Sequence, residues 1–264
     1  MAWTRFAGTL IDQHEVTESI FRADFEISTD APGHEYAPLP VGDESVGLYF
    51  ARDGALLETR ASTAPGAHGG WETVEDEASL GRRNLTVRAF DPSTGVMSID
   101  VAHHASGAAI EWFDSARPGW QVLMAGARSW HRPPSEISGR LCLIADLAGL
   151  PALARILEDT DPRIGVTAVV EVLSPGDLDY LPHHPRLDLV PLIGTGNGVT
   201  PSRLTDHVQQ MLDLETAAYR WIAAEAAQVR HLKKRLRGLG VDKAHCVAVG
   251  YWTDGTHWAG GHRP

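Results

Sequence analysis

Residues 141–172, LCLIADLAGLPALARILEDTDPRIGVTAVVEV, decide the fold of the second half of this chain. Residues 141–145 and 166–172 are continuous apolar runs of strand length, and residues 150–157 between them have the apolar spacing of a helix. Apolar strands separated by helices are typical of a parallel sheet that is covered on both faces. A further apolar run at 187–193 continues this pattern and predicts a third strand.

Two more units follow toward the C-terminus. A strand is predicted at 219–223 before a helix at 225–236, and another at 244–249 before Gly250-Tyr251-Trp252. The alternation of apolar runs with helical patterns begins only after Arg132-Pro133-Pro134-Ser135. We therefore expect a domain boundary near Ser138, with an α/β domain over residues 138–264.

The first half of the chain has a different pattern. Residues 83–90 and 96–101 alternate around the turn sequence of residues 91–95, DPSTG, which predicts a β-hairpin. Mostly strands with one short helix indicate a β-barrel over residues 1–137. The other predicted strands are 20–27, 45–51 and 121–125, and the helix is 107–116.

Composition excludes several kinds of partner and site. The net charge is −11, with 23 Lys and Arg against 34 acids, which argues against a nucleic-acid partner. Cys142 and Cys246 lie in apolar runs and predict free thiols, not a disulfide framework. The 13 histidines lack metal-binding spacing, so we predict no metal site. No stretch suits a signal peptide or a membrane span, so we expect a cytoplasmic protein without a membrane partner.

Seven local segments occur in a specific order along residues 17–252: 42–50 (GDESVGLYF), 83–88, 100–112, 127–130, 146–156, 194–198 and 250–252. In this order they resemble the siderophore-interacting protein family. The resemblance implies a ferredoxin-reductase-like fold, in which an FAD-binding antiparallel β-barrel precedes a parallel-sheet NAD(P)H-binding α/β domain. It also implies a reductase that takes electrons from NAD(P)H or ferredoxin and reduces the iron of a ferric siderophore, which releases the metal.

The resemblance also implies an FAD site. Arg83, Asn84, Leu85 and Thr86 fall on the family's Arg-x-Tyr-Thr/Ser motif, in which Arg83 would clamp the pyrophosphate and the Thr86 hydroxyl would face the flavin ring. A strand whose backbone runs beside the flavin would lead into a helix whose unpaired N–H groups meet the pyrophosphate. The residues of this second segment are Val101, Ala102, His103, Gly107, Ala108, Ala109 and Ile110.

The second domain carries the expected nicotinamide and substrate sides. A strand-to-helix turn is where open parallel sheets bind ligands. The loop 194–198, GTGNG, lacks the spacing of a dinucleotide fingerprint and favours a plain loop over a phosphate cradle. A pair of arginines near the open flavin face would draw in an anionic chelate. The nicotinamide-side candidates are Asp146, Ala148, Ala224, Glu225 and Trp252, and the substrate candidates are Arg128, Arg132, Thr253 and His257.

The chain departs from the family at cofactor positions. Leu85 replaces a Tyr, Ile110 a Ser or Thr, Ala148 a Thr, Ala224 a Gly and Thr253 an Arg. The lost stacking and hydrogen bonding cost about 1–3 kcal/mol, which weakens FAD binding without abolishing it. The added Cβ of Ala224 is expected to obstruct hydride transfer from NAD(P)H. Ferredoxin or free reduced flavin could then supply the electrons.

Three functions fit these observations. The first is an FAD-dependent oxidoreductase that reduces ferric siderophore and needs no catalytic side chain, because the cofactor carries the electrons. The second is a flavin-free relative whose vacated cleft, lined by Leu85 and Ile110, serves non-redox chemistry such as a cyclisation in natural-product biosynthesis. The third is a siderophore carrier. Neither the particular siderophore nor the oligomeric state follows from the sequence.

Overall fold

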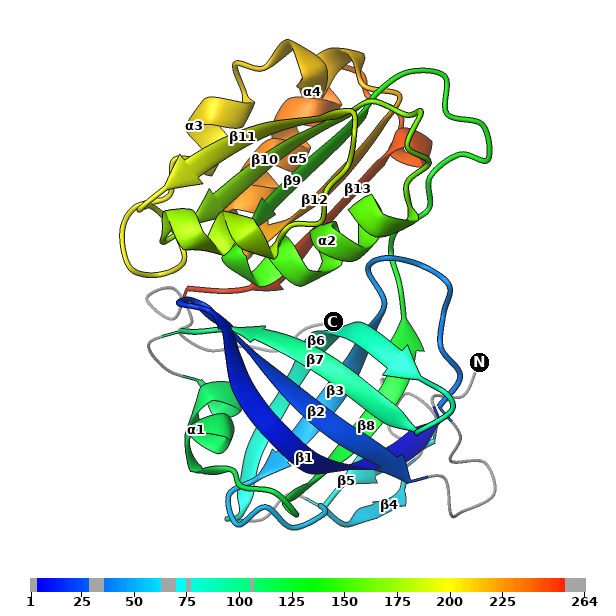
Figure 1. Cartoon of the computed structure of the whole chain (residues 1–264), viewed down its shortest axis with the longest axis vertical. Coiled ribbons are helices and arrows are strands. Elements are labelled where there is room, and N and C mark those ends of the chain that lie inside the picture. The colour runs from blue at the N-terminus through cyan, green and yellow to red at the C-terminus, as the bar shows by residue number, and fades with distance from the viewer. Residues whose placement is uncertain (1–3, 29–35, 63–69, 75–76, 105–106, 255–264) are drawn as a thin grey trace.

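The computed structural model describes residues 4–28, 36–62, 70–74, 77–104 and 107–254 of the 264-residue chain. Figure 1 shows two stacked units, a β-barrel and above it a sheet with helices on both faces. The predicted fold class, an antiparallel barrel followed by a parallel-sheet α/β domain, is confirmed.

Six antiparallel strands close the barrel in the order β1-β2-β7-β6-β3-β8. Helix α1 (Ala108–Ser115) packs onto this barrel because Trp112 and Phe113 are buried against Phe25 and Phe50. A small hairpin of β4 (Thr59–Ala61) and β5 (Trp71–Thr73) forms a separate sheet. The barrel strands are β1 (Arg5–Thr17), β2 (Ile20–Ser28), β3 (Ser45–Ala51), β6 (Ser79–Asp91), β7 (Val96–Ala102) and β8 (Gln121–Arg128).

The second unit is a five-stranded parallel sheet in the order β11-β10-β9-β12-β13. Helix α2 (Leu150–Asp159) covers the face toward the barrel, while α3 (Leu204–Val208), α4 (Leu212–Thr216) and α5 (Ala226–Gly238) cover the other face (Figure 1). Short 3-10 helices lie at Leu147–Gly149, Pro175–Tyr180 and Lys243–His245. The strands are β9 (Leu141–Asp146), β10 (Val166–Val172), β11 (Leu187–Ile193), β12 (Tyr219–Glu225) and β13 (Cys246–Trp252).

Buried polar contacts hold the two units together. Asp177 of the α/β unit accepts hydrogen bonds from the hydroxyls of Thr17 and Ser19 at 2.7 and 2.8 Å. Glu44 of the barrel accepts one from Arg155 of α2 at 3.3 Å. Apolar packing adds to these bonds, because barrel residues Ile20 and Ala102 belong to the core around α2.

The strands at 45–51, 166–172 and 187–193 have the predicted bounds, whereas β1 was missed. Residues 11–16 of β1 are all exposed, so this half of the strand has no alternation to detect. The predicted boundary near Ser138 falls between the end of β8 at Arg128 and the start of β9 at Leu141, and it stays a prediction. Cys142 and Cys246 are free, as predicted. None of the helices in the described ranges combines the length and apolar character that crossing a membrane requires.

Candidate functional site

The pairing between β6 and β7 covers only part of each strand. Their pairing ends at Val87 opposite Ile99, although β6 begins at Ser79 and β7 continues to Ala102. Among the described strands, the part of β6 before Val87 is paired only with β3, and the part of β7 after Ile99 is paired only with β2. The two strands therefore separate from each other there. Beyond Val87 and Ile99 the facing backbone edges of the two strands are not paired with each other, and we call this unpaired region the gap between β6 and β7.

Arg83 lies on β6 beside this gap. Its side chain is exposed, and its guanidinium donates to the carbonyl oxygen of Arg82 at 2.8 Å. Within the described part of the chain Arg83 forms no ion pair, so its charge is available to an anion. Alternation along the strand places Leu85 on the same side as Arg83, and Leu85 packs half-buried against the barrel core. Asn84 is exposed on the opposite side.

Thr86 is buried at the contact between the two units. Its side chain lies near Tyr251 of β13, and burial raises the pKa of that tyrosine. The resemblance implied that the Thr86 hydroxyl faces the flavin ring. That role stays a prediction.

The N-terminus of helix α1 is preceded by Gly107, which has φ 135°. Among the described residues, no side chain caps this helix, and a Cβ on Gly107 would meet no atom within 4 Å. The first N–H groups of such a helix attract anions. Helix α1 contacts β6, the strand that carries Arg83. The side chains of Ala108 and Ala109 are buried and that of Ile110 is half-buried against the barrel core.

The predicted strand beside the flavin is largely engaged in packing. Val101 belongs to the barrel core and Ala102 to the core around α2. The backbone N–H of His103 donates to the carbonyl oxygen of Ser19, and its ring lies 4.9 Å from that of Phe21. These residues therefore shape one wall of the gap through their backbone.

Three carboxylates gather at the carboxyl ends of β9, β10 and β12. The first is Asp146, 2% exposed, which accepts hydrogen bonds from the N–H groups of Ala148 and Glu225 at 3.1 and 2.8 Å. It also accepts one from the indole nitrogen of Trp252 at 2.7 Å. Burial raises the pKa of Asp146 to about 6.

The second carboxylate belongs to Glu171 of β10, and its side chain contacts the glycine-rich loop 194–198. It accepts hydrogen bonds from the Thr195 and Ser202 hydroxyls at 2.8 and 2.7 Å and from the Arg203 N–H at 2.7 Å. A Cβ on Gly196 would collide with the same carboxylate. Residues 194–198 form a loop without helix or strand, and its Thr195 hydroxyl is bound to Glu171.

The third carboxylate, Glu225, caps α5. It accepts hydrogen bonds from the N–H groups of Ala227 and Gln228 at 2.5 and 3.1 Å, so these donors are already used. Open parallel sheets bind dinucleotides at this edge, but three carboxylates repel phosphate. Ala224 is 0% exposed in the core beneath α5. Its methyl group packs into this core, and the expected obstruction of hydride transfer stays a prediction.

Trp252 fills the space between the two units at this edge. In addition to its bond to Asp146, its ring lies 5.0 Å from that of His104 and close to Gly198. Burial lowers the pKa of His104, which favours the neutral ring. The indole thus lies where the sequence predicted a nicotinamide side, while Ala148 is half-buried nearby.

The predicted substrate residues are only partly brought together. In the barrel, Ser45 of β3 lies opposite Arg128 of β8 on one side and opposite Thr86 of β6 on the other. Arg128 is therefore two strand spacings, about 10 Å, from Thr86. Arg132 is exposed and donates to the Ser129 hydroxyl at 3.0 Å. Thr253 is exposed just beyond β13. The remaining candidate, His257, lies outside the described residues.

Sequence reasoning missed the role of Asp43. Its carboxylate is 0% exposed and accepts hydrogen bonds from the Ser129 hydroxyl, the N–H groups of Trp130 and His131, and the indole of Trp221 at 3.2 Å. It thereby fixes the segment after β8 against β12. Burial also lowers the pKa of His131 to about 4. In the sequence, the only sign of this role was that the acidic pair Asp43-Glu44 directly precedes the apolar strand 45–51.

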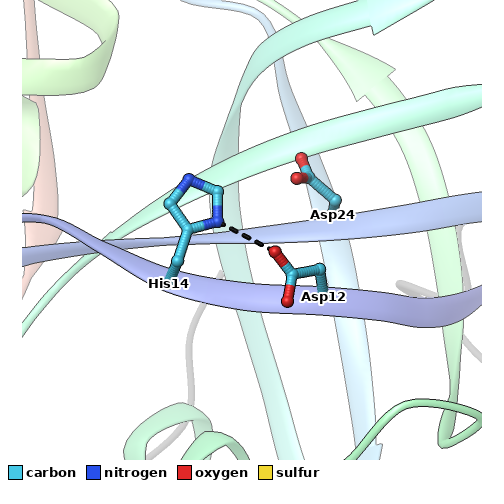
Figure 2. Close-up of side chains that lie close together, drawn as sticks. All are labelled: Asp12, His14 and Asp24. Carbon is cyan, nitrogen blue, oxygen red and sulfur yellow. Dashed lines mark hydrogen bonds and ion pairs between the residues drawn. The ribbon is translucent and has the colours of Figure 1, made fainter.

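One group of possible cation ligands occurs away from this site. Figure 2 shows Asp12, His14 and Asp24 on the barrel, with His14 Nδ1 3.1 Å from an oxygen of Asp12. The side chains of Asp12 and His14 are 63% and 49% exposed, and Asp24 also accepts a hydrogen bond from Ser98. Exposed acidic groups of this kind are common without an ion. We assign no metal site to them.

Comparison with known proteins identifies the family. Residues 10–130 match the family model of the siderophore-interacting FAD-binding domain, and residues 139–255 match that of the siderophore-interacting protein. The chain belongs to the siderophore-interacting protein family. Ferric acinetobactin reductase of Acinetobacter baumannii is 27% identical to it over 184 residues, which cover 66% of this chain and 61% of that protein.

Two further similarities support this assignment. The mycobactin import ATP-binding/permease protein IrtA of Mycolicibacterium smegmatis is 29% identical over 180 residues, which cover 66% of this chain and 20% of IrtA. The solved siderophore-interacting protein of Acinetobacter baumannii superposes with a TM-score of 0.74 at 21% identity, covering 97% of this chain and 92% of that one. The chain thus spans about three fifths of the reductase and one fifth of IrtA.

The buried carboxyl of Asp146 predicts a pH dependence of stability. Its pKa is raised from 3.8 to about 6, so the folded state holds this proton more tightly than the unfolded chain. The stabilising contribution is complete below about pH 4 and is lost as the pH rises through about 6. Relative to Asp146→Asn, the parent should lose on the order of 3 kcal/mol of unfolding free energy between about pH 4 and 7. Urea denaturation of both proteins measures this, and a constant difference would contradict it.

Proposed function

We propose that the protein is an FAD-dependent reductase that releases iron from a ferric siderophore. The observation that carries this proposal is the gap between β6 and β7, with the exposed Arg83 on one side and the uncapped helix α1 beside it. FAD, when bound, supplies the electron that converts ferric to ferrous iron. Arg83 and the N–H groups of α1 would hold its diphosphate, and the backbone of 101–103 would line its ring.

The second unit argues for a donor other than NAD(P)H. The phosphates of a dinucleotide would meet Asp146, Glu171 and Glu225, whose hydrogen bonds already occupy the local donors. Trp252 fills the adjacent space between the two units. We infer that the electrons come from a one-electron protein donor of the ferredoxin class.

The charge around the site favours an anionic substrate. Arg128 and Arg132 flank the end of β8, and Arg82 lies close enough to Arg128 to lower its pKa together with burial. In a chain of net charge −11, this local positive charge would steer a ferric tris-catecholate, which is an anion, more strongly than a neutral ferric hydroxamate.

The cyclase alternative draws no support from these relatives. Leu85 and Ile110, which were expected to line a vacated apolar cleft, pack half-buried against the barrel core. They provide apolar surface there but no group that would act in a cyclisation.

The proposal is tested by the rate of iron reduction with two donors. Protein loaded with FAD is mixed without oxygen with ferric tris-catecholate and either reduced ferredoxin or NADPH, and ferrous iron is trapped by a coloured chelator. Reduction by ferredoxin should be at least roughly tenfold faster, because the acidic edge and Trp252 hinder dinucleotide binding. Equal or faster reduction by NADPH would contradict the assigned donor, and no reduction with either would contradict the function.

A further inference from the structure

A groove of about 600 Å³ runs along the outer edge of β13, on the far side of the sheet from β11. β13 is the last strand of its sheet in Figure 1. Five consecutive residues of this strand, 246–250, line the groove, yet Val247 and Ala248 pack into the cores of opposite faces. Since neighbouring side chains point to opposite faces, a groove that touches all five lies along the backbone edge.

Among the described residues, this edge carries little of the usual protection. Natural edge strands carry charges, prolines or bulges that prevent pairing with another chain. The opposite edge strand, β11, contains Asp188 and Pro191, whereas β13 is Cys-Val-Ala-Val-Gly-Tyr-Trp, with no charge and no proline. Its one register irregularity lies at the end, between Ala224 and Glu225 of the neighbouring β12. The outer edge of β13 can therefore accept a further strand.

The rim of the groove is basic. Lys233 and Arg237, one helical turn apart on α5, line it together with Lys243. All three are exposed, and none forms an ion pair with the residues that the structure describes. The whole chain has only three lysines, and two of them are here, in a protein of net charge −11. The floor is apolar, formed by Leu236, Val241, Val247, Ala248 and Val249, with the half-exposed Trp130 at one side.

We propose that this groove binds an extended acidic segment of a partner protein, which adds a strand to β13. Main-chain hydrogen bonds to the strand edge would supply affinity, and alternate side chains would supply specificity. Carboxylates on one face of the added strand would meet Lys233, Arg237 and Lys243 on the side of α5. Apolar side chains on its other face would contact Val247 and Trp130.

Charge distinguishes this occupant from two others. A second copy of the chain, paired through its own β13 by a two-fold axis, would bring two basic rims together. Residues 255–264 of the same chain, GTHWAGGHRP, contain histidine and arginine but no acid, so they lack the complementary charge. The inference is independent of the flavin chemistry, because no residue of the groove belongs to the gap between β6 and β7.

The test uses a fluorescein-labelled peptide, Val-Glu-Val-Asp-Val-Glu-Val, and its fluorescence anisotropy with the full chain at physiological salt. The charge reversal Lys233→Glu with Arg237→Glu should weaken binding at least roughly tenfold, because each change replaces an attraction with a repulsion. Arg230→Glu with Lys234→Glu, on the same helix but outside the groove, is the matched control and should change binding less than about threefold at this ionic strength.

Two further peptides separate strand addition from simple charge attraction. The same peptide with alternate backbone nitrogens methylated should lose binding, because it cannot donate to the strand edge, and a peptide with lysine for each acid should not bind. The proposal is overturned if the acidic peptide does not bind saturably at millimolar concentration, or if the groove variant binds it like the parent. Equal binding of the methylated peptide would also overturn it. Thermal melting of both variants confirms that each is folded.

Discussion

Arg83→Ala is expected to weaken FAD binding by about ten- to a hundredfold. Removal of a charged hydrogen-bonding partner costs about 1.5–3 kcal/mol, and each 1.4 kcal/mol is about tenfold in affinity. The side chain is exposed and donates to a neighbouring carbonyl, so its loss should leave the unfolding free energy nearly unchanged. Isothermal titration with FAD measures the affinity, and urea denaturation measures the stability.

Arg83→Lys and Arg82→Ala make this result specific. Lysine should recover only part of the affinity, because its ammonium group cannot bind a diphosphate with the fork geometry of a guanidinium. Arg82 lies next to Arg83 but faces the other side of β6, where it donates to the Tyr49 hydroxyl at 3.2 Å. Its removal should therefore affect FAD much less. Binding that is the same in the parent and Arg83→Ala would show that Arg83 does not contact the cofactor.

Asp43→Ala is expected to destabilise the protein by about 3 kcal/mol or more. The change leaves the indole of Trp221 and the N–H groups of Trp130 and His131 buried without an acceptor, and each unsatisfied group costs about 1–3 kcal/mol. Because these donors belong to both the connection after β8 and the sheet, the attachment of the two units should weaken as well. Urea denaturation measures the loss.

Asp53→Ala is the matched control for this prediction. Asp53 is exposed on the barrel and accepts a hydrogen bond from the N–H of Ala55 at 3.1 Å. Its removal should change the unfolding free energy by less than about 1 kcal/mol. If the two variants were equally stable, the buried contacts of Asp43 would not hold the units together.

Much of the fold could be predicted because its strands carry strong local patterns. The runs at 166–172 and 187–193 are mostly apolar, and their bounds match β10 and β11. Helix α5 was predicted at 225–236 and extends over Ala226–Gly238. The short helices α3 and α4, five residues each, were missed because one turn of apolar spacing is too little to recognise.

The candidate site could be predicted only where it is local in sequence. Arg83, Thr86 and Gly107 were proposed from short motifs, and in the structure α1 contacts β6, while the roles of these residues stay predictions. Contacts between residues that are far apart in the sequence could not be predicted from local patterns. Glu171 binds donors that lie 24–32 residues later, and Asp43 binds a side chain 178 residues away.

These distant contacts suggest a different reason why the α/β unit would use NAD(P)H poorly. From the sequence, poor use of NAD(P)H was attributed to one added methyl group at Ala224. In the structure that methyl group is buried in the core, and we propose that the carboxylates Asp146, Glu171 and Glu225 together with Trp252 hinder the binding of a dinucleotide. An acidic sheet edge repels a phosphate electrostatically over several ångströms, whereas a methyl group hinders a ligand only by direct steric contact.

Binding of FAD is the claim on which the account depends, and a titration followed by visible absorption tests it most directly. Purified protein is titrated with FAD, and the flavin band is followed for the shift and fine structure that accompany transfer from water into a protein site. The account predicts saturation at one FAD per chain, with Arg83→Ala requiring about ten- to a hundredfold more FAD for the same change. An absorption spectrum that equals the sum of free protein and free FAD at every concentration would contradict it.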